Sequence, residues 1–164
     1  MNTKDLRIDP IPAGVYYIGD PCYAFSSGDD WDNILEESDY FDKPMIMYKG
    51  HAVGAFSTAY GDGSYIGNMP EGRAHEFPVD SGLIGFVSIN LMPPDFIARI
   101  RSGDEKCGAL VEFTEPWSAA SWNDGMIRIG HTLIDTDQNA EEEDADADER
   151  DQFDDSEFDE TGEY

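Results

Sequence analysis

Short runs of apolar residues, separated by turn-forming residues, make up most of the chain as far as residue 134. Valine, isoleucine, tyrosine and phenylalanine dominate these runs, and they favour strands. Glycine, aspartate, serine and proline stand between the runs, where they favour turns. The pattern predicts short strands over residues 14 to 18, 45 to 48, 52 to 58, 64 to 66, 74 to 79, 83 to 89, 109 to 113 and 126 to 134.

Two segments have a helical pattern instead. In the first, Asp29 or Asp30 can cap a short helix, and the apolar side chains recur at positions i, i+3 and i+4: Trp31, Ile34 and Leu35. In the second, Pro93 and Pro94 can begin a helix that Gly103 ends. These elements predict an α+β, strand-rich domain, either a curved antiparallel sheet or a small barrel, with two short helices.

Negative charge divides the chain into two parts. The sequence has 164 residues, enough for one domain, and a formal net charge of -26. Residues 135 to 164 contain 16 acidic side chains, one basic side chain and few large apolar ones. Burial of so little apolar surface cannot offset the entropy of ordering the backbone. We therefore expect a single folded domain over residues 1 to 134 and a disordered acidic tail over residues 135 to 164.

The strong acidity excludes several classes of partner. Nucleic acids and anionic membrane surfaces attract basic proteins, whereas this chain has a sequence pI near 4.1. No apolar stretch reaches the roughly 18 residues of a membrane span, and residues 1 to 12 do not resemble a signal peptide. We expect a cytoplasmic protein. In that compartment Cys22 and Cys107 are expected to stay reduced rather than form a disulfide.

Three turn-rich segments have a recognisable form: IGDPCY at residues 18 to 23, YGDGSY at 60 to 65 and VDSGLIG at 79 to 85. With Trp31 they resemble a family of small uncharacterised proteins from bacteriophage and bacterial genomes. The resemblance covers about residues 14 to 90. It implies a phage or prophage setting, and no activity or catalytic residue comes with it.

The same segments place an aspartate beside a glycine at three predicted strand ends: Asp20, Asp62 and Asp80. Carboxylates gathered on one rim of a barrel can bind a ligand or a hard cation, and nearby aromatic residues would supply an apolar wall: Tyr23, Trp31 and Tyr65. Aspartate and glycine are also ordinary turn residues, which is the competing interpretation. The three histidines lack the close spacing of zinc sites, so we predict no bound metal and no cofactor.

The leading hypothesis is a non-enzymatic interaction protein that inhibits or modulates a basic, nucleic-acid-binding host protein by mimicking the charge of DNA. The residues expected to contact that partner lie in the tail: Glu141, Glu142, Glu143, Asp144, Asp146, Asp148, Phe153, Phe158 and Tyr164. Two alternatives remain open. The charge can serve solubility alone, or the Asp20, Asp62 and Asp80 rim can belong to a small-ligand or metal-dependent domain.

Overall fold

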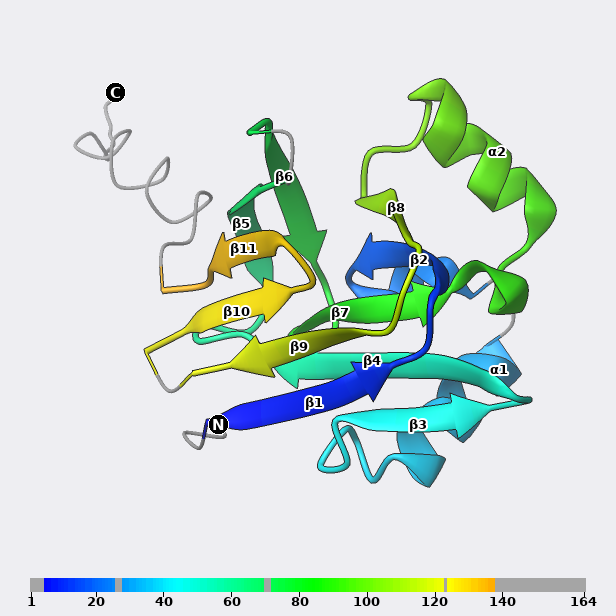
Figure 1. The fold of residues 1–164 in the computed structure, drawn as a ribbon, viewed down its shortest axis with the longest axis horizontal. Helices are drawn as coiled ribbons and strands as arrows, with labels where there is room; N and C mark the ends of the chain where they lie inside the picture. Colours follow the sequence, from blue (N-terminus) through cyan, green and yellow to red (C-terminus); the bar gives the residue numbers. More distant parts are fainter. Residues whose placement is uncertain (1–4, 26–27, 70–71, 123, 138–164) are drawn as a thin grey trace, which may run out of the picture.

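The computed structural model of the protein describes residues 5–25, 28–69, 72–122 and 124–137, and its strands form two antiparallel sheets (Figure 1). The six-stranded sheet has the order β1 (Leu6–Ile11), β9 (Trp117–Ser121), β10 (Met126–Ile129), β11 (Thr132–Asp135), β5 (Gly63–Asn68) and β6 (Ala74–Val79). The five-stranded sheet has the order β3 (Met45–Tyr48), β4 (His51–Ser57), β7 (Leu83–Ser88), β2 (Gly14–Gly19) and β8 (Gly108–Phe113). The predicted α+β, strand-rich class is confirmed. The sheets are curved, and they do not close into a barrel.

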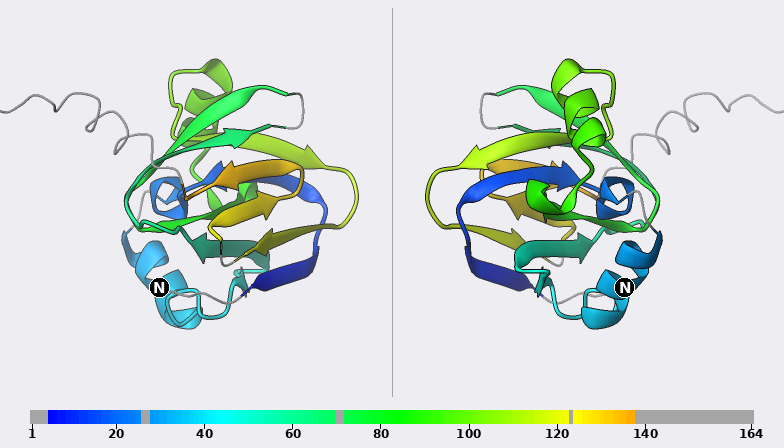
Figure 2. Two further views of the ribbon diagram at one scale, coloured as in Figure 1. Left: turned by 90° about the vertical axis from the view of Figure 1, so that its left-hand side faces the viewer. Right: turned by 90° about the vertical axis from the view of Figure 1, so that its right-hand side faces the viewer.

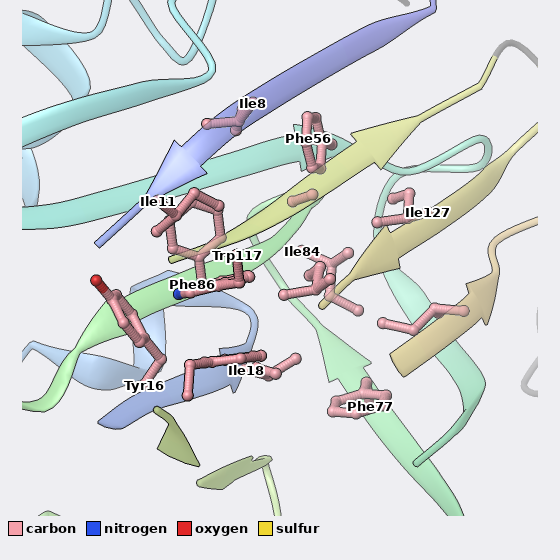
Figure 3. Packing of buried hydrophobic residues seen from close by; sticks show 14 of the residues in the cluster. Ile8, Ile11, Tyr16, Ile18, Phe56, Phe77, Ile84, Phe86, Trp117 and Ile127 are labelled. Atoms are coloured by element: carbon pink, nitrogen blue, oxygen red, sulfur yellow. The ribbon is translucent and has the colours of Figure 1, made fainter. Parts of the chain in front are cut away.

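The main hydrophobic core lies between the two sheets (Figure 3). Tyr16, Ile18 and Phe86 come from the five-stranded sheet, while Trp117 and Ile127 come from the six-stranded one. The Trp117 ring stacks on Phe113 with centroids 3.9 Å apart and meets Tyr16 and Phe86 edge to face. Aromatic pairs of this kind add to the energy gained by burying apolar area.

A second core covers the other face of the five-stranded sheet. Tyr17 and Val53 point to this face and pack with residues of the two α-helices, α1 (Gly28–Glu37) and α2 (Pro94–Ser102), and of the 3-10 helix η1 (Pro21–Ala24). A further 3-10 turn, η2 (Ile89–Leu91), leads into α2. Because this sheet is covered on both faces, its central strands are buried almost continuously, as their unbroken apolar sequences require.

Two strands were not predicted, and one prediction was too long. β1 contains Pro10 and charged residues, and it forms an edge of its sheet, where proline is tolerated. β9 consists mainly of small residues, which carry little strand preference. The single strand predicted over residues 126 to 134 is a hairpin, because Gly130 adopts a left-handed conformation (φ 62°) that reverses the chain between β10 and β11.

The ordered body also extends beyond residue 134. β11 includes Asp135, and Thr136 is fully buried. The Thr136 hydroxyl donates to the Gly125 carbonyl at 2.5 Å and accepts from the Ala59 N–H at 3.0 Å. These two residues therefore belong to the folded body, although the charge pattern had placed them in the tail. Residues 138–164 lie outside the described part of the chain.

Candidate functional site

Asp20 stands at the end of β2, where it begins η1. Its carboxylate accepts from the Cys22 N–H at 2.9 Å, an N-cap that satisfies one of the unpaired donors of the 3-10 helix. Although it is a charged residue, Asp20 is fully buried. A buried carboxylate needs several donors to replace its lost hydration, so the other contacts of Asp20 decide its role.

Those contacts come from the turn between β6 and β7. Oδ2 of Asp20 accepts from the backbone N–H groups of Asp80 at 2.7 Å and Ser81 at 2.8 Å, and Oδ1 accepts from the Ser81 hydroxyl at 2.6 Å. With the Cys22 N–H, four donors occupy both carboxylate oxygens in the described part of the chain. We call this arrangement the Asp20 clamp. It joins the first and third motif segments, which are 60 residues apart.

Tyr23 adds a second link between these two segments. Its hydroxyl donates to Oδ2 of the exposed Asp80 at 2.6 Å. Burial raises the pKa of the Tyr23 phenol, and the bond to Asp80 raises it further. The phenol therefore stays protonated at neutral pH. Beneath it, the Tyr17 hydroxyl donates to the Asp20 carbonyl at 3.0 Å, which fixes the backbone of the clamp.

The second motif segment packs against the same turn. The Thr58 N–H donates to the Gly82 carbonyl at 3.0 Å, and Oδ1 of Asp62 lies 4.0 Å from the position that a Cβ on Gly82 would occupy. Tyr65 is fully buried below this loop and donates to the Gly61 carbonyl at 2.9 Å. The three motif segments thus form one cluster of interlocked turns.

The structure therefore brings together most of the six residues proposed as a ligand site, in different environments. Asp20 is saturated with donors, Asp62 and Asp80 are exposed, and Tyr65 is buried beneath the Asp62 loop. Trp31 is half-buried on α1, where its ring stacks on Phe25 with centroids 6.0 Å apart. Among the described residues no group of three or more histidine, cysteine, aspartate or glutamate side chains is arranged to hold a metal.

The two cysteines flank this cluster, and both are free thiols. Burial raises the pKa of the buried Cys107 thiol to about 11, and the charge of Glu105 acts in the same direction. Burial, followed by the negative charge of Asp20, also raises the pKa of Cys22. Neither thiol forms the thiolate that nucleophilic catalysis requires near neutral pH.

A cavity of about 310 Å³, which the sequence pattern does not predict, lies beside the cluster. Tyr23 and Cys107 form part of its wall, and α2 contributes Phe96 and Arg99. Arg99 bonds Asp95 at 3.0 Å, and its guanidinium lies 5.5 Å from the centre of the Phe96 ring. These residues come from segments far apart in the sequence, so no local pattern identifies the cavity.

A second feature is an acidic surface on α1 and the turn that follows it, which we call the acidic face. It consists of Asp29, Asp30, Asp32, Glu36, Glu37, Asp39 and Asp42, of which all but the half-buried Asp30 are exposed. Asp30 accepts from the Tyr48 hydroxyl at 2.7 Å and from Lys49 at 3.3 Å, and these bonds lower its pKa. The Asp30 carboxylate therefore stays ionised at neutral pH.

Tyr40 lies in the turn after α1, between Asp39 and Asp42 of the acidic face. Its side chain is 74% exposed, and it stands in a run of three residues with left-handed backbone, from Asp39 to Phe41. The turn is held by the Ser38 hydroxyl, which accepts from the Phe41 N–H at 3.0 Å, and by the buried Phe41 ring. The sequence carries a signal for this surface, seven acids within residues 29 to 42, although the predicted partner contacts all lie in the tail.

Comparisons with known proteins assign the chain to no family. No family model, curated protein or solved structure matches the chain. Neither α-helix in the described ranges has the length and apolar character that a membrane crossing needs.

Proposed function

We propose that this protein is a non-enzymatic interaction protein that binds a basic, nucleic-acid-binding protein by presenting a DNA-like array of negative charge. The motif segments resemble those of proteins from phage genomes, so the partner that we propose is a host protein whose activity is inhibited or modulated. The acidic face on α1 is the part of the described body that contacts it, together with the carboxy-terminal carboxylates and aromatic residues expected from the sequence.

The charge density of α1 carries this proposal. Ten helical residues span about 15 Å, and five of them are carboxylates: Asp29, Asp30, Asp32, Glu36 and Glu37. The helix therefore presents one negative charge per roughly 3 Å of its length. One strand of DNA presents one phosphate charge per about 3.4 Å of its axis. A cleft lined with lysine and arginine for a phosphate backbone would meet a comparable linear density on this helix.

Tyr40 supplies an exposed aromatic ring, a kind of contact that carboxylates cannot make. Tyrosine is enriched among the residues that contribute most to binding energy at protein interfaces, because its ring buries a large area at a low entropic cost. Here the exposed ring stands on a turn between Asp39 and Asp42, and the Ser38–Phe41 hydrogen bond holds that turn. We infer that the ring packs against an arginine or an apolar side chain of the partner, with the acidic face beside it.

The test is capture of partners from bacterial lysate by the immobilised full chain at low and high salt, with duplex DNA as competitor. The variant is Asp32→Asn, Glu36→Gln, Glu37→Gln. The matched control is Asp62→Asn, Asp104→Asn, Glu115→Gln, which removes the same charge from exposed sites outside α1 and outside the groove that Arg73 and Arg101 line. A basic partner should bind the α1 variant about tenfold more weakly than the control. Equal binding by both variants, or a complex that saturating DNA leaves intact, would contradict charge mimicry.

A small-ligand domain is the second candidate function, and the cavity beside Tyr23 is the observation that favours it. Tyr23 belongs to the residue set proposed for a ligand site and lines this cavity, whose volume suits a small organic molecule. Native mass spectrometry of the full chain with a mixture of metabolites tests this function. A metabolite that wild type retains and a Tyr23→Ala variant loses would favour it over charge mimicry.

A further inference from the structure

The few basic residues of the described body are unevenly distributed. A groove of about 640 Å³ is lined by Arg73, Arg101 and Lys106, three of the eight described lysine and arginine residues. Only Glu105 and Glu112, two of the 21 described acids, line it. The rest of the described body has five basic residues against 19 acids. We call this groove the cationic groove, because basic side chains outnumber acidic ones in its lining. In the cavity beside Tyr23, by contrast, the acids outnumber the single basic residue, Arg99.

The groove has two walls and an apolar floor. Arg73, the residue before β6, and His75 of β6 form one wall, and the end of α2 with the segment before β8 forms the other. Nε2 of His75 lies 3.2 Å from the Lys106 carbonyl oxygen, so the two walls are in contact. Burial lowers the pKa of His75, and the ring adds a polar contact rather than a charge at neutral pH. Val15, Ile100 and Leu110 give the floor its apolar character.

We propose that the carboxy-terminal segment of the same chain, residues 138–164, binds in the cationic groove as an intramolecular acidic ligand. This segment contains 14 acidic residues and one arginine, and its large apolar side chains are aromatic: Phe153, Phe158 and Tyr164. The carboxylates complement the three cations, and the aromatic rings complement the floor. This inference is independent of the proposed function, because it concerns where the segment rests without a partner.

Length and topology permit this contact. A body of about 137 residues has a radius of gyration near 14 Å, whereas 27 residues span up to about 90 Å when extended. β8 is the edge of its sheet and pairs with β2 on one side, so its other edge can pair with an extended segment in the groove. A nucleic acid is a poorer candidate for this groove, since the surrounding acidic surface repels a polyanion.

Zero-length carbodiimide crosslinking of the full chain tests the proposal. The reagent joins a lysine Nζ and a carboxylate as an amide, and the carbodiimide takes up the released water to become a urea. At low salt, mass spectrometry of the monomer should show crosslinks from Lys106 to residues 138–164 at least about fivefold more often than from the exposed Lys43. Salt at 0.5 M should remove the preference, because screening shortens charge attraction to less than about 10 Å.

A charge-matched pair of variants separates the groove from general attraction. Arg73→Gln with Arg101→Gln should lower the Lys106 crosslinks about fivefold, while Arg7→Gln with Lys49→Gln, outside the groove, should leave them unchanged. Unchanged thermal unfolding would show that each variant is folded. Equal crosslinking of Lys43 and Lys106, or crosslinks found only between copies, would overturn the proposal. Capture of a basic partner is a separate measurement, so failure here leaves the proposed function standing.

Discussion

At the scale of single residues, the Asp20 clamp determines how the motif segments meet. Its carboxylate binds two backbone N–H groups of the β6–β7 turn, one hydroxyl and its own helix cap, and these four donors replace the water that burial removes. A strand end and a turn 60 residues away are thus held by one side chain. The aspartate in IGDPCY and the serine in VDSGLIG have a structural reason to occur together.

We predict that Asp20→Asn lowers the free energy of unfolding by about 2 to 4 kcal/mol. The new amide group would point N–H donors at backbone N–H groups, which leaves buried donors without acceptors. Urea denaturation followed by tryptophan fluorescence measures the loss. Asp62→Asn, at an exposed position in the same cluster, should change the stability by less than about 0.5 kcal/mol. A similar small change for Asp20→Asn would contradict the clamp.

The Cys107 thiol makes the free energy of unfolding depend on pH in the alkaline range. Its folded pKa of about 11 lies above the unfolded value near 9, so its contribution is fully present below pH 9 and is lost as the pH rises through 11. Over this window the free energy of unfolding should fall by up to about 2 to 3 kcal/mol on account of this thiol. Denaturation curves at pH 8 and pH 10.5 should therefore differ less for Cys107→Ala than for wild type. An identical difference in both proteins would show that the thiol does not contribute.

At the scale of elements, α1 carries charge where a helix tolerates it poorly. Asp29 and Asp30 stand in the first turn, where carboxylates are favourable, but Glu36 and Glu37 stand in the last turn, which has no basic residue. The helix dipole and neighbouring acids destabilise carboxylates at that end. We predict that Glu36→Gln with Glu37→Gln raises the free energy of unfolding by about 0.5 to 1.5 kcal/mol while weakening binding to a basic partner.

Calorimetry and a binding titration on the same variant check this prediction. The matched control is Asp104→Asn with Glu115→Gln, which removes the same amount of negative charge outside any helix. A gain in stability that the control reproduces would indicate relief of overall repulsion rather than a helix effect. A variant that is both less stable and a stronger binder would contradict the role assigned to α1.

The end of β11 gives a prediction about truncation. A chain that ends after Asp137 keeps the two hydrogen bonds of the buried Thr136 hydroxyl, whereas a chain that ends after Ile134 loses them. We expect the shorter chain to be less stable by about 1 to 3 kcal/mol, as seen in its thermal midpoint, and the longer chain to match the full protein. Thr136→Val in the full chain should reproduce most of the loss. Equal midpoints for both truncations would contradict this role of Thr136.

The sequence predicted best those elements that are buried on both faces. Strands β2, β4 and β7 have unbroken apolar sequences because helices cover one face of their sheet and the other sheet covers the second. β1 and β9 were not predicted because their hydrogen bonding to each other, rather than the strand preference of their side chains, stabilises them as strands. Trp31, Leu110 and Val111 belong to apolar runs in the sequence and are half-buried, since they stand at the margins of the two clusters.

The candidate sites were less predictable than the fold. The Asp-Gly segments are visible in the sequence. Their contact, however, depends on backbone N–H groups of a distant turn, and any residue type supplies such groups, so the sequence does not identify them. The cavity and the groove are lined by side chains from several elements each. The acidic face, in contrast, is a local feature of residues 29 to 42, which the larger charge of the tail obscured.

At the scale of the whole molecule, charges of one sign oppose compaction. With a formal net charge of -26, self-repulsion destabilises the folded state, and salt screens it. We predict that raising sodium chloride from 20 to 300 mM increases the melting temperature by a few degrees. A neutral osmolyte at equal osmolality is the control for solvent effects. A lower melting temperature in salt would mean that attractive ion pairs outweigh repulsion.

The acidic face and the cationic groove lie apart on the molecule. α1 carries the first and α2 borders the second, and these helices occupy well-separated positions (Figure 2). A partner on α1 and an acidic segment at α2 can therefore be bound at the same time. Competition between them would act through the shared carboxy-terminal residues rather than through overlap on the body.

The strand order has a consequence for how the protein is made. β11, which is synthesised last among the strands of the described residues, lies between β10 and β5 in the middle of its sheet. Until it arrives, the β5–β6 hairpin and the β1, β9 and β10 group have no strand to join them, and their edges remain unpaired. Nascent chains with open edges are prone to pair with one another. The 131 residues that precede β11 already carry 20 acidic and nine basic side chains, and this excess of negative charge would make newborn chains on adjacent ribosomes repel one another during that interval.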